Sequence, residues 1–251
     1  MIGPKHRIPE VRWAEKLSPP RPLLELNGYL YGPPVRRGAT ASLAWIFDHD
    51  PDAALRCALE RAEADGAGTL YVGGPPGNYL VSGADTKSLR WFRARGFSAS
   101  RGHVDLLVDP RDARPDARVA APDDLGASLD FIEQTFGGHW RDESARAAAR
   151  GGLWITRDAQ GLTGFVAAGG NNADAGTFGP VGVAQRARGR GLGEALARTA
   201  LHHLAAQGFA TVTVPWVERE LIPFYKRVAP VLSEARRVRL ARHLSTDAGP
   251  G

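Results

Sequence analysis

Three glycines stand where a helix has to begin, and they are Gly189, Gly191 and Gly193. They lie between the strand-like segment TFGPVGV (177–183) and the helical pattern EALARTALHHLAAQG (194–208). Glycine is unfavourable inside a helix, but helix N-termini carry unpaired N–H groups and a partial positive charge. Without a Cβ atom, an anion can approach these N–H groups closely. The segment therefore predicts a strand, an anion-binding turn and a helix, with Arg188 and Arg190 adding positive charge.

Several ligand classes compete for such a turn. A Walker P-loop needs Lys and then Ser or Thr after the last glycine, but Glu194 and Ala195 follow here. A dinucleotide fold wants G-x-G-x-x-G early in a βαβ unit. This chain instead has G-x-G-x-G late, after an antiparallel hairpin that is predicted around Asp158–Gly161. The third class is coenzyme A. A tight turn with no ligand is the structural alternative, which the flanking arginines disfavour.

The two halves of the chain resemble each other. ALERAEADGAGTLYV (58–72) can be laid on ALHHLAAQGFATVTV (200–214), with the closing glycine three residues before a threonine in both. Each segment is followed by a helix with an aromatic pair, and each half is predicted as strand–helix–strand–helix–strand. The pattern suggests a duplication, with chance similarity as the alternative.

The predicted division follows from a polar stretch with two prolines, PRDARPDAR (110–118). We expect an N-terminal domain at 1–110, a linker at 111–116, a C-terminal domain at 117–244 and a disordered tail at 245–251. Three local predictions concern a strand at RVAA (118–121), a turn at GGHW (137–140) and one last strand at ARRVRLARHL (235–244).

Composition limits the classes of partner. The net charge of +5 comes with a surplus of Arg, which suits an anionic partner or simply reflects a base-rich genome. The lone Cys57 allows no internal disulfide, and no Cys-rich spacing predicts a metal site. No secretory segment or run of about 18 apolar residues is present, so we expect a cytoplasmic protein without membrane contact. The Arg-rich segment 236–242 lacks interleaved aromatic residues, so nucleic acid is not an expected partner.

The segment VGVAQRARGRGLGEAL (181–196) resembles the coenzyme A motif of the GCN5-related N-acetyltransferases (GNAT), Arg/Gln-x-x-Gly-x-Gly/Ala. Arg188, Gly191 and Gly193 occupy its fixed positions. The resemblance covers about 117–244 and implies an α/β fold with a mixed, largely antiparallel sheet flanked by helices. The N-terminal half resembles a degenerate second copy, a tandem layout similar to that of mycothiol synthase.

The resemblance implies acetyl-CoA as co-substrate. The strand 177–183 would splay from ATVTV (210–214), and the pantetheine arm would pair with free backbone groups of Val181 and Val183. The expected cofactor-binding residues are Val181, Gly182, Val183, Arg188, Gly189, Arg190, Gly191, Leu192 and Gly193.

The resemblance also implies catalytic positions. Tyr225 matches the proton donor to the leaving thiolate, with an ordinary half-buried tyrosine as the alternative. Phe92 stands at the matching place in the first half and has no hydroxyl. The general base is open: Glu218 is the first candidate, Glu133 the second, and ordered water a third possibility.

The acceptor side is expected near His139, Trp140 and Trp216, with core packing as the alternative for each tryptophan. The predicted function is acetyl transfer from acetyl-CoA to a primary amine, on a small molecule or a peptide, by direct attack in a ternary complex. The chain would be a monomer or a homodimer. The alternative is a coenzyme A-binding module without catalysis.

Overall fold

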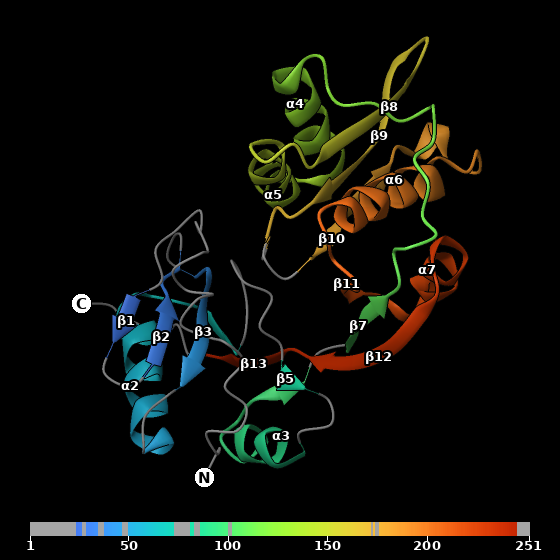
Figure 1. Cartoon of the computed structure of the whole chain (residues 1–251). Coiled ribbons are helices and arrows are strands. Elements are labelled where there is room, and N and C mark those ends of the chain that lie inside the picture. The colour runs from blue at the N-terminus through green and yellow to red at the C-terminus, as the bar shows by residue number, and fades with distance from the viewer. Residues whose placement is uncertain are drawn as a thin grey trace. The chain divides into compact units, whose positions relative to one another are not determined.

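The computed structural model describes residues 24–26, 29–34, 38–46, 50–72, 81–82, 86–99, 102–171, 173 and 176–244 (Figure 1). The chain forms two compact units. Unit 1 comprises residues 1–103 and 235–251, and unit 2 comprises residues 104–234. The predicted disordered tail, 245–251, lies outside the described residues. None of the described helices is long and apolar enough to cross a membrane.

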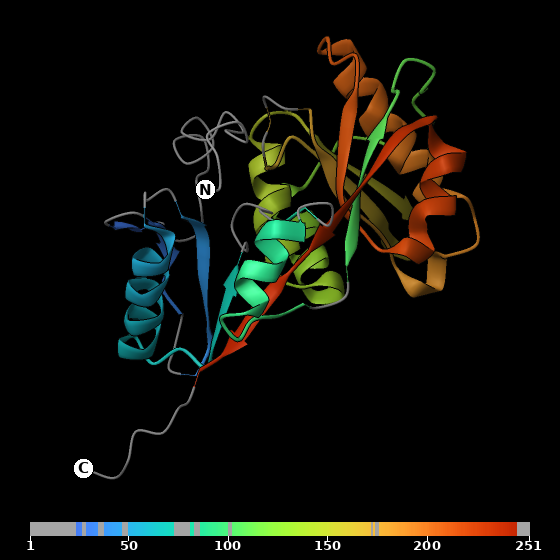
Figure 2. The ribbon, with the colours of Figure 1, turned by 90° about the horizontal axis from the view of Figure 1, so that it is seen from below.

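Unit 1 is built on a six-stranded sheet with the order β1-β2-β3-β4-β13-β6. Its strands are β1 (Leu24–Leu26), β2 (Tyr29–Gly32), β3 (Thr40–Ile46), β4 (Thr69–Val72), β6 (Ser98–Ala99) and β13 (Leu240–His243). Strands β3 and β4 pair in parallel, and the other neighbours pair antiparallel. Helix α2 (Pro51–Ala64) connects β3 to β4 and lies against the strands in both views (Figures 1 and 2). The predicted strand–helix–strand segment is therefore present.

The core of unit 1 lies between α2 and this sheet. Helix α2 buries residues at helical spacing, namely Ala54, Leu55, Ala58 and Ala62. A second helix, α3 (Thr86–Arg93), adds Leu89 and Phe92 to the same cluster. The short strand β5 (Val81–Ser82) pairs antiparallel with the end of β12 (Val231–Val238).

Unit 2 contains strands from two sheets. One is an antiparallel sheet of β8 (Leu153–Asp158), β9 (Gly161–Ala168) and β10 (Phe178–Val183), in the order β10-β9-β8. In the other sheet, β11 (Val212–Val217) pairs antiparallel with β7 (His103–Val108), and β12 is the next strand in the sheet after β7. The predicted hairpin at β8 and β9 is confirmed.

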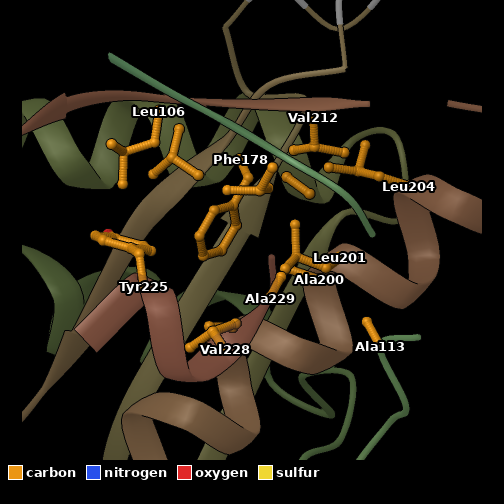
Figure 3. Close-up of a cluster of buried hydrophobic side chains, with 14 of the residues drawn as sticks. Leu106, Ala113, Phe178, Ala200, Leu201, Leu204, Val212, Tyr225, Val228 and Ala229 are labelled. Atoms are coloured by element: carbon orange, nitrogen blue, oxygen red, sulfur yellow. The ribbon is translucent and has the colours of Figure 1, made fainter. Parts of the chain in front are cut away.

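Helices cover both faces of the β8–β10 sheet. On β9, Phe165 and Ala167 pack with α4 (Leu125–Phe136) and α5 (Gly138–Ala148). The alternate residues Val166 and Ala168 pack in the cluster that holds α6 (Leu192–Ala206) and α7 (Ile222–Val228). Alternate residues of β9 therefore point to opposite faces of the sheet, and both faces are buried. Figure 3 shows the second cluster, with Phe178 between residues of α6, α7, β7 and β11. The predicted α/β class, with a mixed and largely antiparallel arrangement flanked by helices, is confirmed.

Three local predictions were wrong. The segment 118–121 makes only an isolated bridge, between Ala120 and Ile155, rather than a strand. Gly137, at a φ of 109°, ends α4, and GHW then opens α5 directly, so the predicted turn is one residue long. The last segment forms two strands, β12 and β13, which break at Arg239.

The two units divide the chain differently from the predicted domains. Residues 104–108 of β7 pair with β11 and so belong to unit 2. Strand β13 pairs with β4 and β6, which places 235–244 in unit 1. Pairing between strands far apart in the sequence places both segments in their units. The local composition that was used to predict the domains does not show this pairing.

Candidate functional site

Strands β10 and β11 diverge, and we call them the splayed pair. They meet at one parallel bridge, between Thr177 and Thr213. The Thr213 N–H there donates to the carbonyl of Gly176 at 2.9 Å. Beyond this closed end the two strands belong to different sheets. The geometry therefore leaves the facing edges of the two strands without a shared ladder along the described residues of the pair.

Irregular backbone marks both strands of the splayed pair. The register of β10 shifts between Phe178 and Val181, and that of β11 between Val214 and Val217. Within the second shift, Trp216 adopts a φ of 62°, a left-handed conformation that bulky residues rarely take. Its N–H donates to Asp105 Oδ1 at 3.1 Å. Such strain is often concentrated at functional sites.

The backbone of β10 presents polar groups to the splayed side. The Ala184 N–H donates to the Thr163 carbonyl of β9 at 2.8 Å. Because backbone groups alternate sides along a strand, those of Val181 and Val183 point away from β9. The Val183 carbonyl accepts a bond from Arg188 Nε at 3.2 Å, which agrees with this orientation.

The start of α6 is uncapped. Gly191 is the N-cap with a φ of 72° and makes no side-chain capping bond, and Gly189 has a φ of 77°. The Ala195 N–H donates to the Gly191 carbonyl at 3.1 Å, so the N–H groups of the three preceding residues lie before the first helical bond. A Cβ added at Gly189 or Gly191 would meet no atom within 4 Å. The helix mouth is therefore open to an anion.

Two other glycines have a packing reason. A Cβ at Gly193 would lie 3.3 Å from the Phe224 ring. A Cβ at Gly182 would lie 2.8 Å from the rings of Phe136 and Phe165. The sequence predicted that all three glycines of the turn clear space for an anion. Gly193 instead makes room for an aromatic side chain of α7.

Arginines around the helix mouth are held by other groups. Arg190 lies 3.6 Å from Asp158, which also pairs with Arg186 at 2.8 Å. The Arg186 hydrogen bond lowers the pKa of Asp158. Arg118 donates to the Arg190 carbonyl at 3.0 Å and so supports the turn, a role that the sequence did not indicate.

A cavity of about 440 Å³ lies beside the first turns of α6. Its lining comprises Asp112, Arg114, Pro115, Asp116, Arg118, Gly191, Glu194, Ala195, Arg198 and Val228. Arg118 pairs with Asp116 at 2.7 Å, and this hydrogen bond lowers the pKa of Asp116 to about 2. Three guanidinium groups, three carboxyl groups and the start of α6 therefore surround a space of ligand size.

Tyr225 lies on α7 and is 8% exposed. Its ring makes edge contacts with Phe178, at 6.1 Å between centroids, and with Phe224, at 4.9 Å. Figure 3 shows it at one end of the cluster, with its hydroxyl oxygen directed away from Phe178. Burial raises the pKa of Tyr225 to about 12, so the phenol keeps its proton at neutral pH.

The two acids considered as general base lie at the surface. Glu218 is exposed and precedes the 3-10 turn Arg219–Leu221, where its carbonyl accepts from the Leu221 N–H at 2.8 Å. Glu133 is exposed and pairs with Arg141 at 3.0 Å. Neither environment distinguishes these carboxylates from ordinary surface acids.

The three residues expected at the acceptor lie on two elements. Trp140 stacks on Phe136, with 5.5 Å between centroids and 22° between planes. His139 is exposed and its ring lies 6.1 Å from that of Trp140. Phe136 also meets Gly182 of β10, so this aromatic group borders one strand of the splayed pair. Trp216 belongs to the other strand, β11.

Nothing in the sequence indicated Glu143, whose carboxyl group has a strongly raised pKa among the acids of the described residues. It lies on α5, and burial raises its pKa to about 7, against the opposing effects of Arg146 and a hydrogen bond from Asn171. Its segment, RDESARAAARG, is polar and resembles a solvated helix. Only the tertiary contact between α5 and the β9–β10 connection identifies it. Perturbed carboxyl groups of this kind are candidates for proton transfer.

Comparison with known proteins finds one matching family model. Residues 123–229 match the model of the Acetyltransferase (GNAT) family. No curated protein sequence matches the chain significantly.

Solved structures share the fold at low identity. A GCN5-related glucosamine N-acetyltransferase region of a fungal multi-domain GH3 β-N-acetylglucosaminidase aligns at a TM-score of 0.65 and 18% identity, over 88% of this chain and 31% of that one. A GCN5-related N-acetyltransferase from Kribbella flavida aligns at 0.60 and 16%, over 95% and 94%. A tandem GNAT protein from the clavulanic acid biosynthesis pathway aligns at 0.58 and 19%, over 89% and 79%. This chain thus spans about a third of the first of these proteins and most of the other two.

Proposed function

We propose that the chain transfers acetyl from acetyl-CoA to a primary amine, because residues 123–229 match the model of the Acetyltransferase (GNAT) family. The splayed pair, with the uncapped start of α6 at its open end, is the observation that carries this proposal. Tandem GNAT proteins are among its structural neighbours. The similarity in layout to mycothiol synthase stays a prediction.

The residues present fit acetyl-CoA. The N–H groups of Leu192 and Gly193 would hold the diphosphate at the helix mouth. The outward backbone groups of Val181 and Val183 would pair with the amides of the pantetheine arm, as in strand addition. From Val183 back to Phe178, a strand covers roughly 16 Å at about 3.3 Å per residue. The thioester would therefore lie toward the closed end of the splayed pair.

Two further groups fit the nucleotide end. Arg188 and Arg190 border the helix mouth, and Arg190 is more than half exposed, at 58% of its side chain. The cavity beside α6 could receive the adenosine part, with guanidinium groups near its phosphate. We keep these arginines as proposed binding residues.

Tyr225 supplies a neutral proton donor in this scheme. The acceptor amine attacks the thioester carbonyl, a C–N bond forms and the C–S bond breaks. Tyr225 protonates the leaving thiolate, and the tyrosinate recovers a proton from the nitrogen as it loses its positive charge. The single cysteine, Cys57, belongs to unit 1, so we propose direct attack in a ternary complex without an acetyl-cysteine step.

The acceptor is proposed as a small-molecule or peptide amine, bordered by His139, Trp140 and Trp216. Glu218 was the first candidate for the general base, but its carboxylate is exposed like an ordinary surface acid, and the proposed function does not rest on it. The second candidate function is coenzyme A binding without turnover. This second function is favoured if the splayed pair binds acetyl-CoA while no acceptor amine reaches the thioester.

The test is a calorimetric titration with acetyl-CoA, followed by a screen of primary amines that reads free thiol. We expect saturable binding and thiol release that depends on one class of amine. Binding without release for any amine would support the second candidate. An absence of heat with acetyl-CoA, checked by a filter-binding assay, would contradict both functions.

A further inference from the structure

Glu143 lies on α5 against Gly170, which follows strand β9. Its side chain is half-buried, and a Cβ on Gly170 would lie only 2.8 Å from Glu143 Cγ. The same Cβ would lie 2.4 Å from the Glu143 carbonyl. The absence of a side chain at Gly170 therefore lets the β9–β10 connection press against this part of α5.

Two polar groups orient the Glu143 carboxyl group. The Asn171 side chain donates a hydrogen bond to it. Asn171 Oδ1 accepts in turn from Arg146 Nη2 at 2.7 Å, and Arg146 Nε also donates to the Gly170 carbonyl at 3.2 Å. Asn171 itself is only 9% exposed, and we call the hydrogen-bonded set of Glu143, Asn171 and Arg146 the relay.

This relay is attached to the closed end of the splayed pair. The Thr177 hydroxyl donates to the Asn171 carbonyl. Thr177 is also the residue that bridges Thr213 of β11. Two hydrogen-bonded steps thus connect the Glu143 carboxyl group to the place where β10 and β11 separate.

Helix α5 also packs into an apolar cluster through Ala147. The elements packed on α5 contribute a cluster of Leu129, Ile132, Leu153, Ile155, Phe165 and Ala167. On α4, the acid Glu133 is paired with Arg141 at 3.0 Å. Arg146 is the charged group that acts on Glu143, and its effect is smaller than that of burial. Desolvation therefore controls the Glu143 carboxyl group, which titrates with a pKa of about 7.

Resting on the proposed function, we propose that Glu143 is the general base, which takes a proton from the acceptor ammonium at the closed end of the splayed pair. Trp140 lies one turn earlier on α5, on the same side of the helix. A cationic amine with an adjoining apolar group would place its nitrogen at Glu143 and its apolar part on Trp140.

The proton balance is complete with this residue. The ammonium gives one proton to the Glu143 carboxylate and becomes a neutral nucleophile. After attack, the nitrogen loses its second proton, which replaces the one that Tyr225 gives to the thiolate. The products are the acetamide, the free thiol and a protonated Glu143, which releases its proton to water.

The test compares wild type, Glu143→Gln and Asp142→Asn with the best amine of the screen. Glutamine keeps the shape of the side chain and an acceptor for Asn171, but it takes no proton. We expect kcat/KM at pH 7 to fall by about 100-fold in Glu143→Gln, with acetyl-CoA affinity within about twofold of wild type. Asp142→Asn removes the neighbouring carboxylate of the same helix and should retain full activity.

The pH profile separates proton transfer from a structural role. Wild-type kcat/KM should rise with pH and level off above about 7, where Glu143 is ionised. In Glu143→Gln it should continue to rise, about tenfold per pH unit, up to the pKa of the amine. If Glu143→Gln does not fold, Glu143→Asp is tested instead. We expect its kcat/KM to be about tenfold lower than that of wild type and still to level off near pH 7.

Each outcome decides the inference. An active wild type whose rate and profile are unchanged in Glu143→Gln, or in Glu143→Asp, overturns the role of Glu143 and leaves the proposed function intact. Loss of acetyl-CoA binding in Glu143→Gln shows a structural role and also overturns it. A wild type that turns over no amine overturns the proposed function, and this inference with it.

Discussion

The two units contain the same strand–helix–strand connection, but they close it differently. In unit 1, β3 and β4 pair in parallel at four successive positions, from Thr40 and Thr69 to Leu43 and Val72. In unit 2, β10 and β11 share one bridge between Thr177 and Thr213 within the described residues. A continuous ladder leaves no backbone group for a ligand, whereas a splayed pair leaves two edges. The comparison shows how one connection can serve as core or as a binding edge.

The helix that follows the first strand of this connection also differs between the two units. In unit 1, Asp50 caps α2, and its carboxylate accepts from the N–H groups of Asp52 at 3.1 Å and Ala53 at 3.0 Å. In unit 2, Gly191 at the start of α6 makes no side-chain capping bond. The chain itself therefore supplies the anion for α2, while the N–H groups of α6 remain for another partner.

A third difference is a single hydroxyl group. Phe92 and Tyr225 are both buried, at 6% and 8% exposure, and both rings contact the preceding aromatic residue edge-on. The packing role is therefore common to the two units, and only Tyr225 has a proton to donate. We interpret unit 1 as a fold that keeps the packing of such a domain without its chemistry.

Replacing Tyr225 by Phe makes unit 2 like unit 1 and carries the largest expected effect. Thiol release should slow by about 10²–10³-fold in kcat, because the leaving thiolate loses its proton donor. Affinity for acetyl-CoA should stay unchanged. Since burial raises the pKa of Tyr225 to about 12, the wild-type rate should show no decline from its ionisation between pH 7 and 10. Steady-state kinetics over this range measures both points.

The reverse replacement is the control. Phe92→Tyr should give unit 1 no activity and should lower the free energy of unfolding by about 1–3 kcal/mol, since a hydroxyl group enters an apolar cluster. Equal rates for Tyr225→Phe and wild type near neutral pH would remove Tyr225 from the mechanism.

Introducing an aspartate at Gly191 imitates the cap of unit 1 and carries the next largest effect. The new carboxylate would occupy the N–H groups at the start of α6 and repel a diphosphate. We expect the Kd for acetyl-CoA to rise about 100-fold, equivalent to about 2.7 kcal/mol. Calorimetric titration measures it, with Gly191→Asn as the uncharged counterpart.

Gly208→Asp provides a matched control at the other end of α6. Gly208 has a φ of 93° and open space around it, so the strain of substitution is similar. Its effect on acetyl-CoA binding should be within about twofold of wild type. A Gly191→Asp protein with unchanged affinity would show that the helix mouth does not hold the diphosphate.

Much of the fold follows from local patterns in the sequence. The predicted hairpin and the predicted strand–helix–strand connection that ends at residue 72 are found as β8–β9 and β3–α2–β4. The glycines at 189 and 191 predict a turn before α6, and both adopt positive φ angles there. These features depend on neighbours in sequence, which is why they could be predicted.

Features that depend on tertiary contacts could not be predicted from the sequence. The pKa of Glu143 is raised by desolvation, and Gly170, which lies against Glu143, is 27 residues later in the chain. Gly193 is needed because Phe224, about thirty residues later, packs against it. Trp216 has a positive φ that no residue preference predicts. The pairing of β13 with unit 1 likewise joins residues far apart in the chain.

The cap of α2 gives a smaller, stability-based test of the comparison. Asp50→Ala should lower the free energy of unfolding by about 1 kcal/mol, because two N–H groups lose their acceptor. Asp50→Asn retains a capping oxygen and should lower the free energy of unfolding by only a few tenths of a kcal/mol. Denaturant titrations of the three proteins measure the difference. An unchanged midpoint in Asp50→Ala would mean that water replaces the cap without loss.

The smallest expected effect concerns the ion pairs beside the two helix starts. Arg118 pairs with Asp116 at 2.7 Å near α6, and Arg95 pairs with Asp52 at 2.5 Å near α2. Each pair is partly exposed, so Asp116→Asn and Asp52→Asn should each cost less than about 1 kcal/mol at pH 7. The folded pKa of Asp116, about 2, lies below its ordinary value of 3.8. Its contribution is therefore complete above pH 4 and disappears as pH falls toward 2. Unfolding titrations of Asp116→Asn and wild type should accordingly converge on acidification, and a constant gap would assign the loss to packing instead of charge.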